Sequence, residues 1–120
     1  MKKLLLLSAL LIFTCSNFSC KNTNGKSRSK SYNYLTYGDQ IWTVENAEMV
    51  TYRDGTPIPQ VTDNTEWENL TTGAWCYYDN DPRKGKLYNW YAVAGIHDND
   101  PNTPNKELAP EGWHVPSDAE

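Results

Sequence analysis

Beyond the first twenty residues, one cysteine and two histidines are the side chains of this sequence best able to do covalent chemistry. A cysteine nucleophile needs a base within hydrogen-bond reach and a third group that orients the base. Cys76 stands between Trp75 and Tyr77 in a stretch that predicts a strand, so we expect it to pack rather than react. His97 falls in a polar loop, and His114 falls in a motif that the fold explains better than catalysis does. We therefore predict no catalytic residue and no enzyme.

Two short segments rich in Asp and Asn could coordinate a hard cation through their oxygen atoms; they are residues 79–81 and 98–102. Ca²⁺ takes about six to eight oxygen ligands, and neither segment has the Gly and terminal Glu of an EF-hand loop. Asp, Asn and Pro are also ordinary turn formers. We expect no resident cofactor and no metal site, with calcium in these loops as the alternative.

Aromatic side chains are abundant, with five Trp and eight Tyr. Six of them could stack on the C–H faces of sugar rings or anchor a protein interface: Trp67, Trp75, Tyr77, Tyr78, Trp90 and Tyr91. Because a small domain short of Leu and Ile must fill its core with aromatics, we expect only about two of the six to be exposed. The candidate ligand-binding residues are Trp75, Tyr77 and Tyr78.

Short strands must position these side chains, since Gly, Pro, Asn and Asp interrupt the chain often and long helical periodicity is absent. The patterns predict strands at residues 41–44, 49–52 and 74–78. Asp54-Gly55 predicts a tight turn, from which residues 57–59 leave as an extended edge.

Helical structure is predicted to be brief. Residues 63–70 predict one or two helical turns, capped by Asn64 or Thr65, with Trp67 and Leu70 packing inward. Residues 87–93 predict a strand or a short helix, and residues 97–110 a long polar loop. The predicted fold class is α+β: short antiparallel strands with one or two helices and long ordered loops.

The N-terminus has the pattern of an export signal. Lys2 and Lys3 precede an apolar run, residues 4–13, that is ten residues long. A membrane-spanning helix needs about twenty, whereas a secretory signal needs a short run of this kind. We predict a lipoprotein signal peptide at residues 1–19 with lipid on Cys20, which follows the small Ser19; Cys15 is the alternative site.

A flexible tether is predicted at residues 20–31, which are basic, rich in Ser and Asn, and without an apolar side chain to bury. From Tyr32 onward the chain is acidic, with five Lys and Arg against fifteen Asp and Glu. Nucleic-acid binding selects a Lys/Arg-rich surface that releases counterions, so we exclude nucleic acid as a partner.

The last residues form the start of a helix. Ser117 is a predicted N-cap, Glu120 stands at the capping-box position, and Asp118 lies in the first turn. A capping box with no helix after it would cap nothing. We therefore expect residues 32–120 to be the N-terminal part of a domain, truncated at Glu120.

Several motifs in order resemble the Fibrobacter succinogenes major paralogous domain; they occupy residues 42, 54–59, 70–74, 85–93 and 112–120. The resemblance covers about residues 37 to 120. It implies a secreted or lipid-anchored bacterial protein whose domain continues past this point. Residues 112–120 are also similar to formylglycine-generating enzymes, which implies a C-type lectin-like fold. The cysteines of those enzymes lie outside the matched segment, so none of their active site is carried over.

The function predicted from these features is an exported, lipid-anchored, non-enzymatic module that binds an extracellular glycan or protein. The expected location is the bacterial cell envelope outside the cytoplasm, at the outer membrane or cell surface, with the membrane as a partner through the N-terminal lipid. Two alternatives stay open. One is an enzyme related to formylglycine-generating enzymes, and the other is a structural envelope protein.

Overall fold

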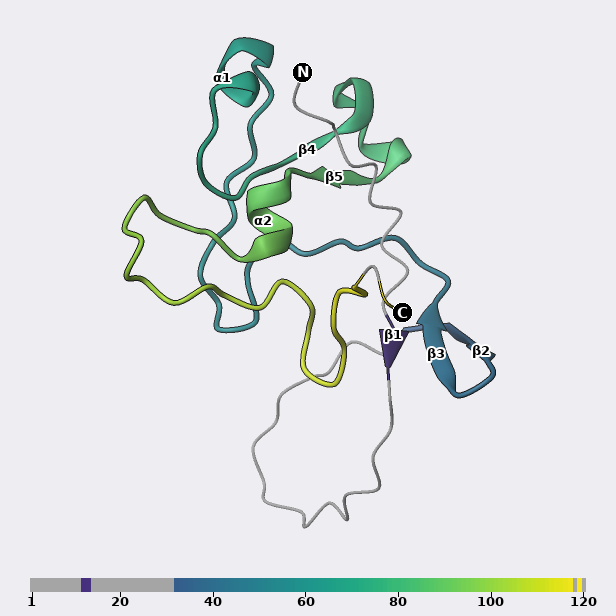
Figure 1. The fold of residues 1–120 in the computed structure, drawn as a ribbon. Helices are drawn as coiled ribbons and strands as arrows, with labels where there is room; N and C mark the ends of the chain where they lie inside the picture. The colour runs from purple at the N-terminus through teal and green to yellow at the C-terminus, as the bar shows by residue number, and fades with distance from the viewer. Residues whose placement is uncertain (1–11, 14–31, 118, 120) are drawn as a thin grey trace.

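The computed structural model describes residues 12–13, 32–117 and 119 of the chain (Figure 1). Within them the fold is a small α+β arrangement of short antiparallel strands in two small sheets, with two short α-helices. The predicted fold class is thus confirmed at this level. Signal residues 1–11 and 14–19, both candidate lipidation sites Cys20 and Cys15, and the tether to residue 31 lie outside the described residues. So do Asp118 and Glu120 of the expected helix start.

The first sheet has the strand order β1-β3-β2, all antiparallel. The strands are β1 (Ile12–Phe13), β2 (Tyr34–Tyr37) and β3 (Gln40–Thr43). Gly38 opens the two-residue turn between β2 and β3 with φ 59°, a position where such hairpins favour glycine. All four residues of β2 are exposed, so this hairpin projects at the lower right of Figure 1 with little packed against it.

The second sheet is the hairpin of β4 (Trp75–Tyr77) and β5 (Lys86–Tyr88). Trp75 pairs with Tyr88, and Tyr77 pairs with Lys86. Because successive side chains alternate between the two faces of a strand, these four side chains share one face, and the pair Cys76 and Leu87 lies on the other. Two 3-10 turns join the strands, η1 (Tyr78–Asn80) and η2 (Pro82–Lys84).

The predicted Asp54-Gly55 turn is present: the Gly55 amide donates to the Tyr52 carbonyl, and Gly55 has φ 89°. The strand predicted at residues 49–52 is reduced to a single antiparallel bridge between Thr51 and Pro57. Proline has no N–H to continue a ladder, which explains why pairing stops after one bridge. Beyond it, Gln60 forms a parallel bridge with Trp75.

Both α-helices are one-turn elements with a side-chain cap. In α1 (Asn64–Glu68) the cap is Asp63, whose Oδ1 accepts from the Glu66 amide at 2.8 Å. The prediction of Asn64 or Thr65 as cap was therefore wrong by one or two positions, because Asp is an equally good cap and precedes them. In α2 (Trp90–Ala94) the cap is Asn89. Residues 87–93 thus contain the end of β5 and most of α2.

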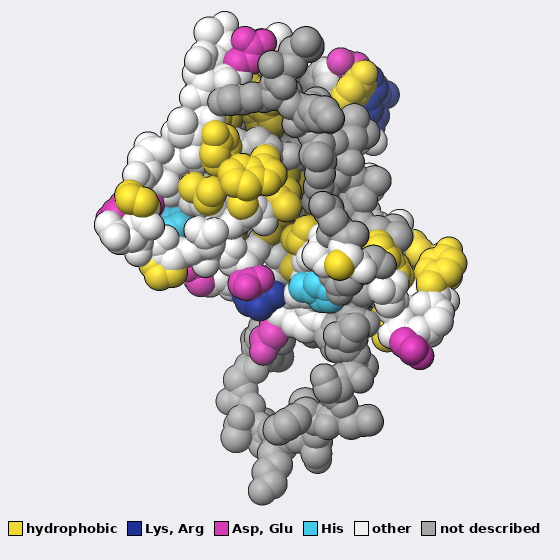
Figure 2. Space-filling model, viewed as in Figure 1, with side chains coloured by type: hydrophobic (Ala, Val, Ile, Leu, Met, Phe, Trp, Pro, Cys, Tyr) yellow, Lys and Arg dark blue, Asp and Glu magenta, His cyan; other side chains and the backbone are white. Residues whose placement is uncertain are grey.

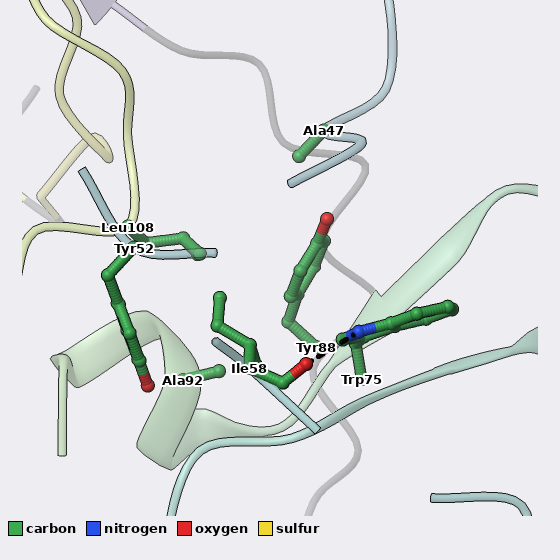
Figure 3. Close-up of a cluster of buried hydrophobic side chains, with 7 residues drawn as sticks. All are labelled: Ala47, Tyr52, Ile58, Trp75, Tyr88, Ala92 and Leu108. Atoms are coloured by element: carbon green, nitrogen blue, oxygen red, sulfur yellow. Dashed lines mark hydrogen bonds between the residues drawn. The ribbon is translucent and has the colours of Figure 1, made fainter. Parts of the chain in front are cut away.

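The core lies where α2, the β4–β5 hairpin and the Asp54-Gly55 turn region meet (Figure 3). Its buried cluster is Ala47, Tyr52, Ile58, Trp75, Tyr88, Ala92 and Leu108. Aromatic rings supply most of its bulk, as expected for a domain with few large aliphatic residues. Residues 97–110 contain no helix or strand, and this loop contributes buried Leu108 and Ala109 to the interior.

Candidate functional site

A groove with a cavity volume of about 420 Å³ lies between α1, β4 and η1. Its walls include three aromatic side chains, Trp67, Tyr77 and Tyr78, and three short polar ones, Asp63, Asn64 and Asn80. We call it the aromatic groove. The volume is within the range of small-molecule sites, which combine apolar walls with a few polar groups that fix orientation.

The far face of the β4–β5 hairpin forms part of this groove. Cys76 and Leu87 pair across the hairpin and face away from the Trp75 side, so both line the groove. Trp67 of α1 is half-buried and stands on the opposite wall. Tyr77 ends β4 in a half-buried position that contacts both the core and the groove.

The turn η1 brings the remaining wall into place through unusual backbone conformations. Asp79 and Asn80 have φ values of 53° and 56°, in the left-handed region that few residues other than glycine adopt. Asn and Asp tolerate this region best, because their short side chains hydrogen-bond locally. Two such residues in succession reverse the chain and set Tyr78, Asp79 and Asn80 along the groove.

Among the described residues, some polar side chains of the groove form hydrogen bonds within the protein, and others do not. Asp63 Oδ1 caps α1, and Asp79 Oδ2 accepts from Lys84 Nζ at 2.7 Å. Within the described part of the chain, the structure records no intramolecular hydrogen bond for the side-chain amides of Asn64 and Asn80. Exposed amides of this kind are able to bind hydroxyl groups in either direction, since each carries a donor and an acceptor.

Cys76 is poorly suited to nucleophilic attack. Burial raises the pKa of its thiol, which lowers the fraction of reactive thiolate. No histidine is among the described residues that line the groove, and His97 belongs to a different cavity. Among the described residues that line the groove, no histidine stands beside Cys76 to act as its base.

The structure separates the three predicted ligand-binding residues. Tyr77 and Tyr78 line the groove, but Trp75 is only 7% exposed and belongs to the core cluster. The Trp75 indole Nε1 donates to the Ile58 carbonyl at 2.9 Å, and Lys86 Nζ lies 5.1 Å from its ring centroid. Trp75 therefore holds the hairpin in place, and the third aromatic side chain that lines the groove is Trp67.

Two of the six aromatic candidates are exposed, as expected: Tyr78 at 45% and Trp90 at 59%. Trp90 lies on α2 outside the groove, where it packs edge-to-face on Tyr91 with ring centroids 5.3 Å apart. Figure 2 shows hydrophobic side chains gathered over the middle of the face seen in Figure 1 and again on the projecting β2–β3 hairpin.

A second cavity of about 330 Å³ lies along the loop 97–105 and includes the Asp/Asn-rich segment considered for calcium. Here the carboxylates serve the loop itself: Asp98 accepts from the Asp100 amide, and Asp100 accepts from Asn102. In the other segment Asp81 accepts from Arg83. No group of three or more His, Cys, Asp or Glu among the described residues is placed to share a metal ion.

Sequence reasoning missed the polar part of the groove, because it did not bring Asp63, Asn64 and Asn80 together around one cavity. Nothing in the local pattern shows that α1 lies beside β4. The only signal was the Asp/Asn content of residues 79–81, which we had considered for a cation. In Figure 1, α1 and the turns that follow β4 both lie at the top of the view.

Comparison with protein families gives one match: the model of the Fibrobacter succinogenes major domain covers residues 35–120. Comparisons with curated proteins and with solved structures return no match. The matched region includes the β4–β5 hairpin, both α-helices and the whole aromatic groove. The chain therefore belongs to the Fibrobacter succinogenes major domain family.

Proposed function

We propose that the protein is an exported, lipid-anchored, non-enzymatic module that binds an extracellular glycan in the aromatic groove. The observation that carries the proposal is that Trp67, Tyr77 and Tyr78 line one cavity together with the side-chain amides of Asn64 and Asn80. The described part of the chain records no hydrogen bond for these two amides. Aromatic planes suit the C–H faces of sugar rings, and the amides of Asn64 and Asn80 suit their hydroxyl groups. The C-type lectin-like fold remains part of this proposal.

Two observations support binding over catalysis: no histidine lies among the described groove residues, and burial raises the pKa of the Cys76 thiol. The alternative enzyme would need a second reactive group in this groove. Of the described residues that line it, the titratable ones are two Asp, two Tyr and the Cys, and both Asp side chains already accept local hydrogen bonds.

Binding to a glycan array followed by calorimetry tests the proposal. Replacing Trp67 or Tyr78 with Ala should weaken binding by about tenfold or more, because loss of an aromatic side chain on which a ligand ring stacks costs about 1–3 kcal/mol. Trp90→Ala is the matched control, since Trp90 is an exposed aromatic side chain that lies outside the groove. An array without any hit would contradict glycan binding and leave a protein ligand or a structural role as the alternatives. Equal losses in all three variants would contradict the groove.

Lipid anchoring is a separate part of the proposal. No helix of the described residues is long and apolar enough to cross a membrane. Cys20→Ala should abolish incorporation of labelled fatty acid and release the protein from membranes. If Cys15→Ala loses the label and Cys20→Ala keeps it, the lipid is on Cys15. If both single variants still incorporate the fatty acid, neither cysteine is the single site of lipid attachment. Cleavage before Cys20 would also remove β1, leaving β2 and β3 as a two-stranded hairpin.

A further inference from the structure

We infer that the aromatic groove selects glycans whose sugar units carry free amino groups, and disfavours acidic glycans. This inference rests on the proposed function and names the substrate class of the same site. It depends on the charges around the groove, on the position of Lys84, and on the spare acceptors of the walls.

The charged side chains that line the groove are acidic, and one of them, Asp79, pairs with Lys84 at the rim. Asp63 and Asp79 are both carboxylates, and no Lys, Arg or His is among the described residues that line it. Uronic acids or sulfated sugars would bring a further negative charge against these groups. A protonated amine would instead meet carboxylate and aromatic faces, the combination that proteins use to bind organic cations.

Lys84 shows that this corner of the molecule accommodates an ammonium group. Its Nζ lies 4.9 Å from the centroid of the Tyr78 ring and 2.7 Å from Asp79 Oδ2. The side chain of Lys84 is 44% exposed, so it lies at the rim and leaves the cavity open. The amine of a bound sugar would meet the same two kinds of group, a carboxylate and an aromatic ring, with Asp63 as the carboxylate that Lys84 leaves unpaired.

Asp63 supplies the charge that Lys84 does not neutralise. Its Oδ1 accepts from the Glu66 amide, and no partner for Oδ2 is recorded within the described part of the chain. The group proposed to bind the amine is this carboxylate oxygen of Asp63, and not the backbone amides at the start of α1. The amides of Asn64 and Asn80 remain available for the neighbouring hydroxyl groups.

Calorimetry of the full chain with tetramers of glucosamine, glucose and galacturonic acid tests the inference, at low salt and a mildly acidic pH that protonates glucosamine. We expect the glucosamine tetramer to bind about three- to tenfold more tightly than the glucose tetramer, from partly exposed cation–π and ion-pair contacts. Galacturonate should bind more weakly than glucose. Added salt should reduce the preference, because it screens exposed charges.

Variants separate this site from the general acidity of the chain, which would attract any polycation. Asp63→Asn keeps an N-cap acceptor but removes the charge, so it should bring the glucosamine and glucose affinities together. Asp39→Asn removes one exposed carboxylate on the β2–β3 turn and should leave the preference unchanged. Tyr78→Ala should weaken both ligands.

Three outcomes would overturn the inference. Glucose binding at least as tightly as glucosamine would remove the preference while leaving a glycan site intact. An equal effect of Asp39→Asn and Asp63→Asn would assign the preference to overall charge. No binding by any tetramer, with an empty glycan array, would instead overturn the proposed function itself.

Discussion

Arg53 and Ala109 are joined by a hydrogen bond across 56 positions of sequence: Arg53 Nε donates to the Ala109 carbonyl at 2.9 Å. The same guanidinium donates through Nη2 to the carbonyls of Trp113 and Pro110, at 2.8 and 3.3 Å. One side chain thus holds the C-terminal segment, including the Gly-Trp-His-Val-Pro motif, against the Asp54-Gly55 turn. The ion pair with Glu107, at 3.8 Å, is a minor addition.

Removing this side chain should therefore destabilise the fold. We expect Arg53→Ala to lower the free energy of unfolding by about 2 kcal/mol, since hydrogen bonds from a charged donor are lost and Ala109 is buried. Arg53→Lys should recover only part of it, because an ammonium cannot reach three carbonyls in a planar fork. Glu107→Gln should cost below about 0.5 kcal/mol, as exposed pairs usually do. Urea denaturation measures all three variants. Full stability in Arg53→Lys, together with a loss in Glu107→Gln as large as that in Arg53→Ala, would assign the effect to charge alone.

The Tyr-to-Phe substitution should have opposite effects on stability at two buried tyrosines. Tyr52 is 2% exposed and its hydroxyl has no hydrogen-bond partner in the described structure, whereas the Tyr88 hydroxyl donates to the Met49 carbonyl at 2.8 Å. Tyr52→Phe should leave the free energy of unfolding unchanged or raise it by up to about 1 kcal/mol, and Tyr88→Phe should lower it by about 1–2 kcal/mol. Thermal melts of both variants decide this; a larger loss in Tyr52→Phe would show that its hydroxyl is paired.

Gly95 ends α2 in a position that no other residue can occupy. It has φ 77°, and an added Cβ would lie 1.9 Å from the Lys106 carbonyl oxygen and 2.6 Å from the Lys106 amide nitrogen. Gly95→Ala should lower the free energy of unfolding by about 3 kcal/mol or more. The substitution both strains the left-handed backbone at residue 95 and forces the backbone of Lys106 to move away.

Gly55 is the matched control for Gly95, since it has φ 89° but open space around the Cβ position. Gly55→Ala should cost only the strain of the left-handed conformation, about 1 kcal/mol. Chemical denaturation of the two variants measures the difference. Equal losses of unfolding free energy in the two variants would mean that the loop containing Lys106 moves aside at little energetic cost.

Stability should decline at acidic pH as the ion-paired carboxylates of Asp54 and Asp81 become protonated. Lys106, whose Nζ lies 2.5 Å from Asp54 Oδ2, holds the pKa of Asp54 well below its usual range, helped by the Thr56 amide. Arg83 lowers the pKa of Asp81 in the same direction. A pKa lowered in the folded state contributes stability that is present above the unfolded value. That stability is lost as pH falls from about 4 through the folded pKa.

Asp54→Asn should therefore flatten the acid side of the stability curve. Unfolding midpoints measured in urea between neutral and strongly acidic pH provide the comparison. An identical acid slope in Asp54→Asn and the unsubstituted chain would contradict the role of the Lys106 pair.

Local patterns were sufficient wherever one short stretch determines its own conformation. The alternation at residues 41–44 and 74–78 predicted β3 and β4, and Asp54-Gly55 predicted its turn. The pattern was insufficient at residues 49–52, because the partner strand there contains Pro57 and Pro59. It was also insufficient at residues 87–93, where a change from β5 to α2 at Asn89 looks like one apolar run.

By itself the sequence determined the family, the α+β class and several of the short elements, because turn residues and alternation act over a few positions. The tertiary structure alone decided which face of β4 is buried. Alternation places Trp75 and Cys76 on opposite faces but does not say which face meets the core. Packing against Ile58 and Tyr88 buried Trp75, and the approach of α1 turned the other face into a groove. Contacts between segments far apart in the chain select one face by the apolar area they bury, and no local pattern encodes that choice.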